Sequence, residues 1–148
     1  MTQLAQQSTS GAVGKVIYTA KAHTTGGREN GVSRTSDGQL DIKLSLPGSG
    51  RPGTNPEQLF AAGWSACFEG ALAFAAQKKH LKLPPETAID AEVDLHLDNG
   101  AFFLSARLNI SIPGVDRSIA QGLVEDAEGI CPYSKATKGN IAVTYNLV

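Results

Sequence analysis

The chain of 148 residues lacks the features that mark secreted, membrane-spanning or nucleic-acid-binding proteins. Its first residues, MTQLAQQSTSG, contain neither the basic start nor the apolar stretch of a secretory signal, and no run approaches the ~18 apolar residues of a membrane span. Thirteen basic and fourteen acidic residues give a net charge of −1, so electrostatics provides no basis for binding nucleic acid or an anionic membrane. We therefore expect a cytoplasmic protein whose partners are small molecules or other proteins.

Motifs for nucleotide cofactors, serine hydrolases and metal sites are also missing. The sequence has no GxGxxG, P-loop or GxSxG pattern. His23, His80 and His96 are isolated, and no Cys/His spacing resembles a metal site. We therefore expect neither a cofactor nor a bound metal.

Cysteine is scarce, since Cys67 and Cys131 are the only two. In a reducing compartment such a pair is more often catalytic or redox-sensing than a permanent disulfide. Cys67 lies in an apolar segment, where the competing interpretation is a buried, inert cysteine. Cys131 precedes Pro132, which suits the first turn of a helix, where free N–H groups and the helix dipole favour an anionic sulfur. We therefore expect Cys67 to be shielded and Cys131 to be the accessible thiol.

Hydrophobic periodicity predicts a single α+β domain over residues 1–148. Residues 1–12 are small and polar and are expected to form a mobile tail or an early edge segment. The expected strands cover residues 13–23, 32–36, 40–46, 89–97, 102–112 and 141–147. The turn sequence Asp98-Asn99-Gly100 should join two of them into a hairpin.

Two helices are predicted between these strands. Thr54-Asn55-Pro56-Glu57 combines a capping residue, a proline suited to the first helical position and an acidic first turn, so a helix begins there. This helix is apolar on nearly every face as far as Gln77, which is typical of a helix at the centre of a molecule or at an interface. Asp116 is expected to cap a second helix that ends at Gly129.

A reactive Cys67 needs a nearby cation, because burial alone raises the pKa of a thiol above its ordinary value of about 8.5. Arg28, in the glycine-rich segment TTGGRENG, is the best candidate for that cation. The alternative interpretation is a solvated loop arginine, and Arg34 and Arg51 compete for the same role.

Glu57 also has two interpretations. It either forms a capping box with Thr54 or orients an arginine through a bidentate ion pair. Ten residues of straight helix place Glu57 and Cys67 ~15 Å apart, too far for one guanidinium to contact both. Either the helix breaks near Gly63, or the groups meet across a subunit interface.

Aromatic residues recur along the same helix at spacings that place them near Cys67. Phe60 and Trp64 precede it, Phe68 adjoins it, and Phe74 lies two turns after it. This aromatic stripe predicts an apolar neighbourhood for the thiol. The competing interpretation is a packed core helix.

Three blocks of the sequence resemble the organic hydroperoxide resistance (Ohr) family within the Ohr/OsmC superfamily. They are TGGR at 25–28, TNPEQLFAAGWSACF at 54–68 and CPYSKATKGN at 131–140, in the family's order and spacing. Trp64, where tyrosine is frequent, and Glu69, a charge close to Cys67, depart from the family's pattern. The resemblance implies two β-sheets wrapped around central helices in an intertwined homodimer, with active sites at the subunit boundary.

For the activity, the resemblance implies a thiol peroxidase that reduces alkyl or fatty-acid hydroperoxides to alcohols. Cys67 would be the peroxidatic cysteine, Cys131 the resolving cysteine, and Arg28 with Glu57 the pair that activates Cys67 and binds the peroxide. A Cys67 sulfenic acid would condense with Cys131 to a disulfide. A dithiol such as a lipoylated protein would reduce that disulfide, and the aromatic stripe would contact the hydrocarbon part of the substrate.

Two other classes of function stay open at this point. One is a non-catalytic redox sensor or apolar-ligand-binding protein, in which the two cysteines switch the conformation. The sensor version lacks support from any basic DNA-binding element. The other is a hydrolase or structural domain with inert cysteines, which turnover of a peroxide would exclude.

Overall fold

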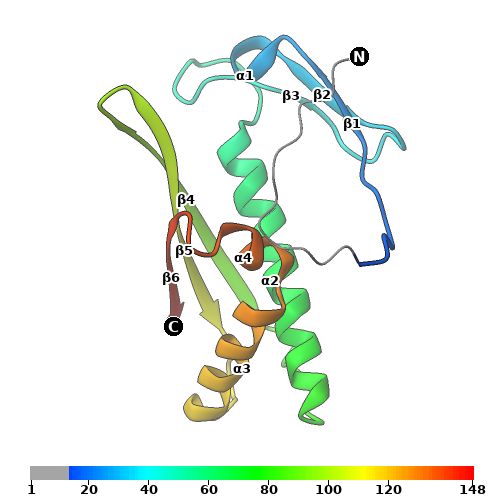
Figure 1. Ribbon diagram of the computed structural model, residues 1–148, viewed down its shortest axis with the longest axis vertical. Coiled ribbons are helices and arrows are strands. Elements are labelled where there is room, and N and C mark those ends of the chain that lie inside the picture. The colour runs from blue at the N-terminus through cyan, green and yellow to red at the C-terminus, as the bar shows by residue number, and fades with distance from the viewer. Residues whose placement is uncertain (1–13) are drawn as a thin grey trace.

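The computed structural model describes residues 14–148, so the tail expected at residues 1–12 lies outside the described part. The elements follow the order β1–α1–β2–β3–α2–β4–β5–α3–α4–β6 and form two three-stranded sheets (Figure 1). This arrangement confirms the predicted α+β class.

The first sheet is antiparallel, with strand order β1-β2-β3. Its strands are β1 (Ala22–Thr25), β2 (Val32–Thr35) and β3 (Asp41–Lys43), and the short helix α1 (Gly27–Asn30) connects β1 to β2. The strand expected at residues 13–23 was wrong for residues 14–21, which form no strand and are exposed. Strand-forming side chains alone do not make a strand there, because no strand of the described chain pairs with residues 14–20 and Lys21 contributes only its carbonyl, which accepts from the Ser36 N–H at 3.1 Å. The strand expected at 40–46 is likewise confined to β3.

The second sheet consists of the hairpin β4 (Ala88–Asp98) and β5 (Ala101–Ser111), with β6 (Ala142–Leu147) parallel to β5. Asn99 and Gly100 have φ angles of 48° and 78°, as a two-residue hairpin turn requires at both positions. The hairpin and the last strand are therefore confirmed.

Three longer helical segments complete the fold: α2 (Pro56–Lys78), α3 (Arg117–Ile130) and α4 (Pro132–Thr137). The cap of α2 is Asn55, whose side chain accepts from the Gln58 N–H at 2.9 Å. Of the two interpretations of Glu57, the capping box with Thr54 is not the one observed, because the Thr54 hydroxyl bonds to the Gln58 side chain.

Asp116 caps α3 as predicted, and its carboxylate accepts from the N–H groups of Ser118 and Ile119. The helix does not stop at Gly129 but continues to Ile130, so Cys131 follows it directly. Cys131 is both the C-cap residue of α3 and the N-cap residue of α4.

The core lies between the second sheet and the helices α2 and α3 (Figure 1). Every second residue of the inner part of β5 is buried, and Leu108 and Ile110 meet Leu72 and Leu123 from the helices. By length and composition alone α2 could cross a membrane, so the expectation that no segment approaches a span was wrong. Its contacts with β4 and α3 are those of a core helix.

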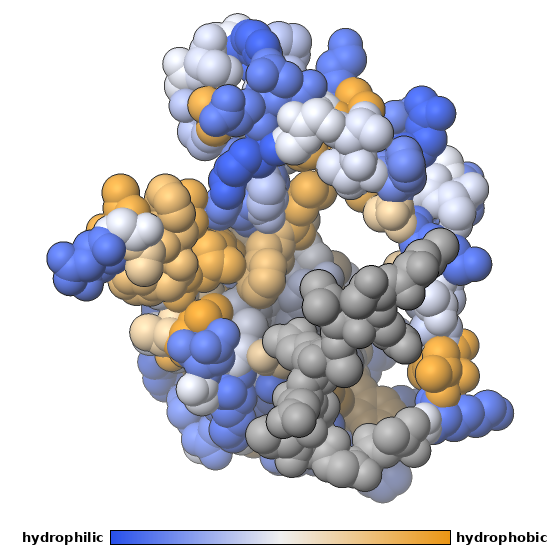
Figure 2. Space-filling model, turned by 45° about the horizontal axis from the view of Figure 1, so that its top comes forward, coloured by the Kyte–Doolittle hydropathy of each residue, from blue (hydrophilic) through white to orange (hydrophobic). Residues whose placement is uncertain are grey.

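Apolar side chains remain uncovered on two parts of this chain. One face of α2 exposes small residues, among them Ala62, Ala66 and Ala73. The end of the β4–β5 hairpin exposes Leu97 and Phe102, and Figure 2 shows apolar surface gathered over this hairpin. Apolar patches of this kind are typical of interaction surfaces.

Candidate active site

The two cysteines lie side by side. Cys67, in the middle of α2, and Cys131, between α3 and α4, have sulfur atoms 3.4 Å apart. Both are free thiols. The packing of α2 against α3 and α4 brings them together, so the fold places two oxidisable sulfurs within reach of one another.

The exposure of the two thiols is the reverse of what the sequence predicts. Cys131 is 0% exposed, whereas Cys67 is only partly buried. Cys131 is enclosed because it joins two helices that both pack on the core, and its backbone N–H bonds to the Ala127 carbonyl. Cys67 is thus the thiol that a molecule from solvent can reach.

Effects of opposite direction act on the pKa of Cys67. Burial raises this pKa, the neighbouring Cys131 thiol raises it further, and a hydrogen bond from the backbone N–H of Tyr133 lowers it. The net direction is upward. The start of α4, expected to stabilise a Cys131 thiolate, therefore directs one N–H group, that of Tyr133, to the Cys67 sulfur instead.

Gly63 allows α4 to approach α2 closely. A Cβ at this position would lie 2.8 Å from the Tyr133 hydroxyl and 3.2 Å from its ring carbons, so only glycine leaves room for the phenol. The Tyr133 ring also packs edge-on against Phe60, with centroids 5.9 Å apart. Helix α2 is unbroken at Gly63, which excludes the helix break considered from the sequence.

Arg28 and Glu57 form an ion pair at the other end of this region, with Nη2 and Oε2 2.5 Å apart. The arginine lies on α1, which is a single helical turn rather than a loop. Gly26, the residue before this turn, has a φ angle of 75°, which favours glycine. The Glu57 side chain is 16% exposed and that of Arg28 is 40% exposed. The carboxylate thus orients an arginine, the second of the two interpretations of Glu57.

The competing arginines have other partners. Arg34 pairs with Asp41 at 2.9 Å on the exposed first sheet. Arg51 donates to the Glu29 carbonyl at 2.7 Å and so braces the turn that carries Arg28. Among these three arginines, Arg28 alone is paired with Glu57.

The ion pair does not reach Cys67 within one chain. Glu57 is in the first turn of the unbroken α2, and the ten-residue rise to Cys67 amounts to ~15 Å. The unbroken helix excludes one of the two arrangements considered from the sequence, the break near Gly63.

An apolar groove of about 770 Å³ opens beside the ion pair. Its apolar walls include Leu46, Pro47, Ala91, Val93, Leu95 and Phe102. These residues are not among the site candidates predicted from the sequence, because the alternating pattern of Ala91, Val93 and Leu95 indicates only a sheet face. Which cavity that face adjoins depends on how the hairpin leans over α2.

The aromatic stripe of α2 is divided between core and surface. Trp64 and Phe68 are each 0% exposed, so they pack the core and offer no surface to a substrate in this structure. The contact predicted for these two residues fails for that reason. Phe60 is half-buried beside Tyr133, and Phe74 is exposed with the Lys78 ammonium over its ring.

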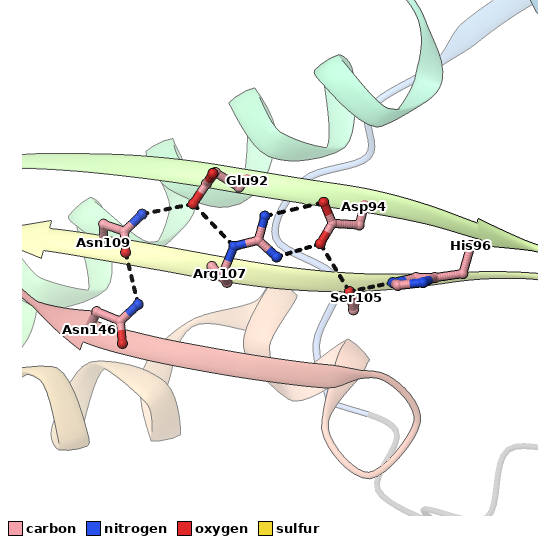
Figure 3. A network of polar contacts seen from close by, with 7 residues as sticks. All are labelled: Glu92, Asp94, His96, Ser105, Arg107, Asn109 and Asn146. Carbon is pink, nitrogen blue, oxygen red and sulfur yellow. Dashed lines mark hydrogen bonds and ion pairs between the residues drawn. The ribbon is translucent and has the colours of Figure 1, made fainter.

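A serine, a histidine and an aspartate also meet on the outer face of the second sheet (Figure 3). Ser105 lies between the other two: its hydroxyl contacts His96 Nε2 at 2.7 Å and donates to Asp94 at 3.3 Å. A nucleophilic triad needs the histidine in the middle. Asp94 is instead paired with Arg107, which lowers the pKa of the carboxyl, so this is a polar ladder rather than a hydrolase site.

Comparison with known proteins identifies the family of the chain. The OsmC-like protein family matches residues 47–146. The organic hydroperoxide resistance protein of Xanthomonas axonopodis pv. citri (strain 306) is 51% identical over 137 residues, which cover 90% of this chain and 96% of that protein.

Solved structures show the same fold. The crystal structure of organic hydroperoxide resistance protein OhrB of Bacillus subtilis has a TM-score of 0.84 and 40% identity, covering 90% of this chain and all of that one. An organic hydroperoxide resistance protein of Legionella pneumophila has a TM-score of 0.83 and 39% identity, covering 90% of this chain and 98% of that one. The chain therefore belongs to the organic hydroperoxide resistance family of OsmC-like proteins.

Proposed function

We propose that the protein is a cysteine-based peroxidase that reduces organic hydroperoxides to alcohols and protects against oxidative stress. The observation that carries this proposal is the 3.4 Å separation of the Cys67 and Cys131 sulfurs, one partly exposed and the other enclosed. An accessible thiol beside a buried one is the arrangement needed for a peroxidatic and a resolving cysteine. The related proteins named for organic hydroperoxide resistance support the substrate class.

The proposed reaction has two steps on the protein. The Cys67 thiolate attacks the O–O bond of the hydroperoxide, takes the terminal oxygen as a sulfenic acid and releases the alkoxide, which leaves as the alcohol. The Cys131 thiol then attacks the Cys67 sulfur. The S–O bond breaks, the S–S bond forms, and the leaving hydroxide departs as water with the proton of Cys131.

Activation of Cys67 requires a cation, because burial raises the pKa of its thiol. We assign that role to Arg28, held by Glu57 and supplied by one subunit of a homodimer to the partner subunit's Cys67. The unbroken α2 and the uncovered apolar faces of α2 and the hairpin support this arrangement.

The groove beside Arg28 and Glu57 supports an organic substrate. Its apolar walls can bury a hydrocarbon chain while the guanidinium receives the peroxide oxygens. Hydrogen peroxide has no such chain. The groove, rather than the aromatic stripe of α2, is therefore the surface to which we assign substrate preference.

A dithiol must restore the enzyme. Its thiolate attacks Cys67, the more exposed sulfur, and Cys131 leaves as a thiolate; the second thiol then displaces Cys67 and the dithiol becomes a disulfide. A lipoylated protein is the proposed reductant, in the reducing environment of the cytoplasm. No cofactor enters this cycle.

The proposal is tested by adding one equivalent of cumene hydroperoxide to the fully reduced protein. We expect one equivalent of cumyl alcohol and an intact mass lower by two hydrogen atoms, with a peptide map that joins Cys67 to Cys131 within one chain. Persistent free thiols would contradict the proposal. A disulfide between chains would contradict the roles of the cysteines.

A second candidate function, binding of an apolar ligand without turnover, is favoured by the volume of the same groove. It predicts tight binding of cumyl alcohol or a fatty acid and no change in the thiols when peroxide is added. The peroxide experiment therefore distinguishes the two functions.

A further inference from the structure

The position of Cys131 depends on α4, a helix too short to be stable on its own. Helix α4 has six residues, far fewer than the ~12–15 that an isolated helix needs in water. Its place relative to α2, and with it the distance between the two sulfurs, must come from contacts with the rest of the protein.

These contacts converge on one side chain, that of Ser134. It is 2% exposed, and its oxygen accepts a hydrogen bond from Trp64 Nε1 at 3.1 Å and another from the Tyr145 hydroxyl at 3.0 Å. Trp64 belongs to α2 and Tyr145 to β6. Tyr145 is itself fixed by stacking on Phe68, with centroids 5.3 Å apart. A single buried oxygen thus joins α4 to a helix and to a strand.

The Trp64–Ser134 bond runs beside the cysteine pair. Trp64 lies three residues before Cys67 on α2, and Ser134 lies three residues after Cys131. The hydrogen bond and the sulfur pair are therefore two adjacent links between the same two segments. Sliding or tilting of α4 along α2 would break the first link and open the second.

We propose that Ser134 is a positioning residue for the resolving step, with Trp64 and Tyr145 as its two donors. This inference depends on the proposed function, because it concerns the attack of Cys131 on oxidised Cys67. Ser134 touches neither reacting sulfur; it holds the start of α4 so that the Cys131 sulfur stays within reach. Without its oxygen the buried Trp64 donor and the half-buried Tyr145 donor lose their acceptor, and α4 is free to shift.

The expected effect is on the partition of the Cys67 sulfenic acid. In Ser134→Ala we expect disulfide formation to slow by about tenfold, because losing the acceptor costs on the order of one buried hydrogen bond. The sulfenic acid then persists, and excess peroxide converts more of it to sulfinic acid than in the wild type. Rapid acid quenching followed by mass spectrometry follows the condensation in every variant, including Trp64→Phe, which lacks the single tryptophan of the chain. The same spectra give the sulfinic fraction.

The chain offers a matched control on the same helix. Thr137 is also buried, but among residues 14–148 its hydroxyl bonds only to the backbone carbonyls of Tyr133 and Ser134 within α4. Thr137→Val removes a buried hydroxyl without cutting the link to α2 or β6, so we expect its condensation rate to match the wild type. Equal slowing in Thr137→Val and Ser134→Ala would overturn the proposal, as would a Ser134→Ala rate equal to that of the wild type.

Two further variants keep the test decisive if Ser134→Ala does not fold. Trp64→Phe and Tyr145→Phe each remove one donor and leave the serine bonded to the other. Each is expected to slow condensation by a smaller factor. Wild-type condensation rates in both of these variants would contradict the role of Ser134.

A peroxide-free measurement separates this inference from the proposed function. Oxidised glutathione forms a mixed disulfide with Cys67, which Cys131 displaces, releasing glutathione and forming the same protein disulfide. The rate of that release reports the position of Cys131 without any peroxide. Slower release in Ser134→Ala supports the positioning role even if the wild type fails to reduce hydroperoxides, and an unchanged rate overturns it.

Discussion

Cys131 points its thiol at Cys67 from the junction of two helices, at a sulfur–sulfur distance of 3.4 Å. A disulfide bond of about 2.05 Å requires only a modest approach from there. The backbone N–H of Tyr133, the second residue of α4, bonds to the same Cys67 sulfur. The junction therefore brings both the Cys131 thiol and a backbone hydrogen bond to the Cys67 sulfur.

The two cysteines should respond differently to substitution. Cys67→Ser removes the accessible nucleophile, so we expect no peroxide consumption. Cys131→Ser keeps the nucleophile and should reduce one equivalent of hydroperoxide before stalling as a sulfenic or sulfinic acid. Single-turnover peroxide consumption, with trapping of the sulfenic acid by dimedone, measures both outcomes. Equal loss of the first turnover in both variants would reverse or abolish the assigned roles.

Arg28 should set the pH at which Cys67 becomes reactive. The thiolate fraction rises as the pH passes through the Cys67 pKa, and a neighbouring guanidinium moves that pKa downward against the effect of burial. In a Cys131→Ser background, we expect Arg28→Ala to raise the Cys67 pKa. The pH–rate profile should shift to higher pH by the same amount. Thiolate absorbance during a pH titration measures the change.

Two controls sharpen this experiment. Arg34→Ala removes an arginine whose pair with Asp41 is exposed, and it should leave the titration unchanged. Glu57→Gln keeps the size of the side chain but weakens the hold on Arg28, so it should lower the rate chiefly through misorientation. An Arg28→Ala titration identical to that of its Cys131→Ser parent would rule out this activation.

Substrate preference should follow the groove rather than the aromatic stripe. Four or five buried methylenes contribute ~0.8 kcal/mol each, so kcat/KM for an alkyl hydroperoxide should exceed that for hydrogen peroxide by on the order of a hundredfold or more. Phe102→Ala, in the groove wall, should reduce this ratio. Phe74→Ala, an exposed aromatic outside the groove, should not. The opposite result for the two variants would restore the stripe as the binding surface.

The cap of α2 gives a prediction about stability. Asn55→Ala removes the side chain that accepts from the Gln58 N–H and should lower the free energy of unfolding by about 1 kcal/mol. Thr54→Ala removes only an exposed bond to the Gln58 side chain and should change it by no more than ~0.5 kcal/mol. Urea unfolding measures both free-energy changes, which can be compared if the two variants have the same denaturant slope. A larger loss in Thr54→Ala would favour the capping box instead.

The amino-acid sequence was sufficient for features that depend on neighbours along the chain. The hairpin follows from two alternating segments around Asn99-Gly100, whose positive φ angles the turn requires. The cap on α3 follows from Asp116, and the first turn of α4 from Pro132. Three sequence blocks were enough to predict the family. Each of these features is decided within a few residues, so a local pattern carries it.

Tertiary packing decided the rest. The exposure of each cysteine depends on the packing of α3 and α4, which buries Cys131 in the core. A local sequence pattern does not predict that packing. The partner of Glu57 depends on a turn that is 29 residues away in the sequence. Trp64 and Phe68 have the spacing of a binding stripe, yet both are buried in the core, because a long apolar helix buries whichever face its neighbours meet. Contacts between segments far apart in the chain are set by the shape and fit of the whole core, and only the folded structure contains that information.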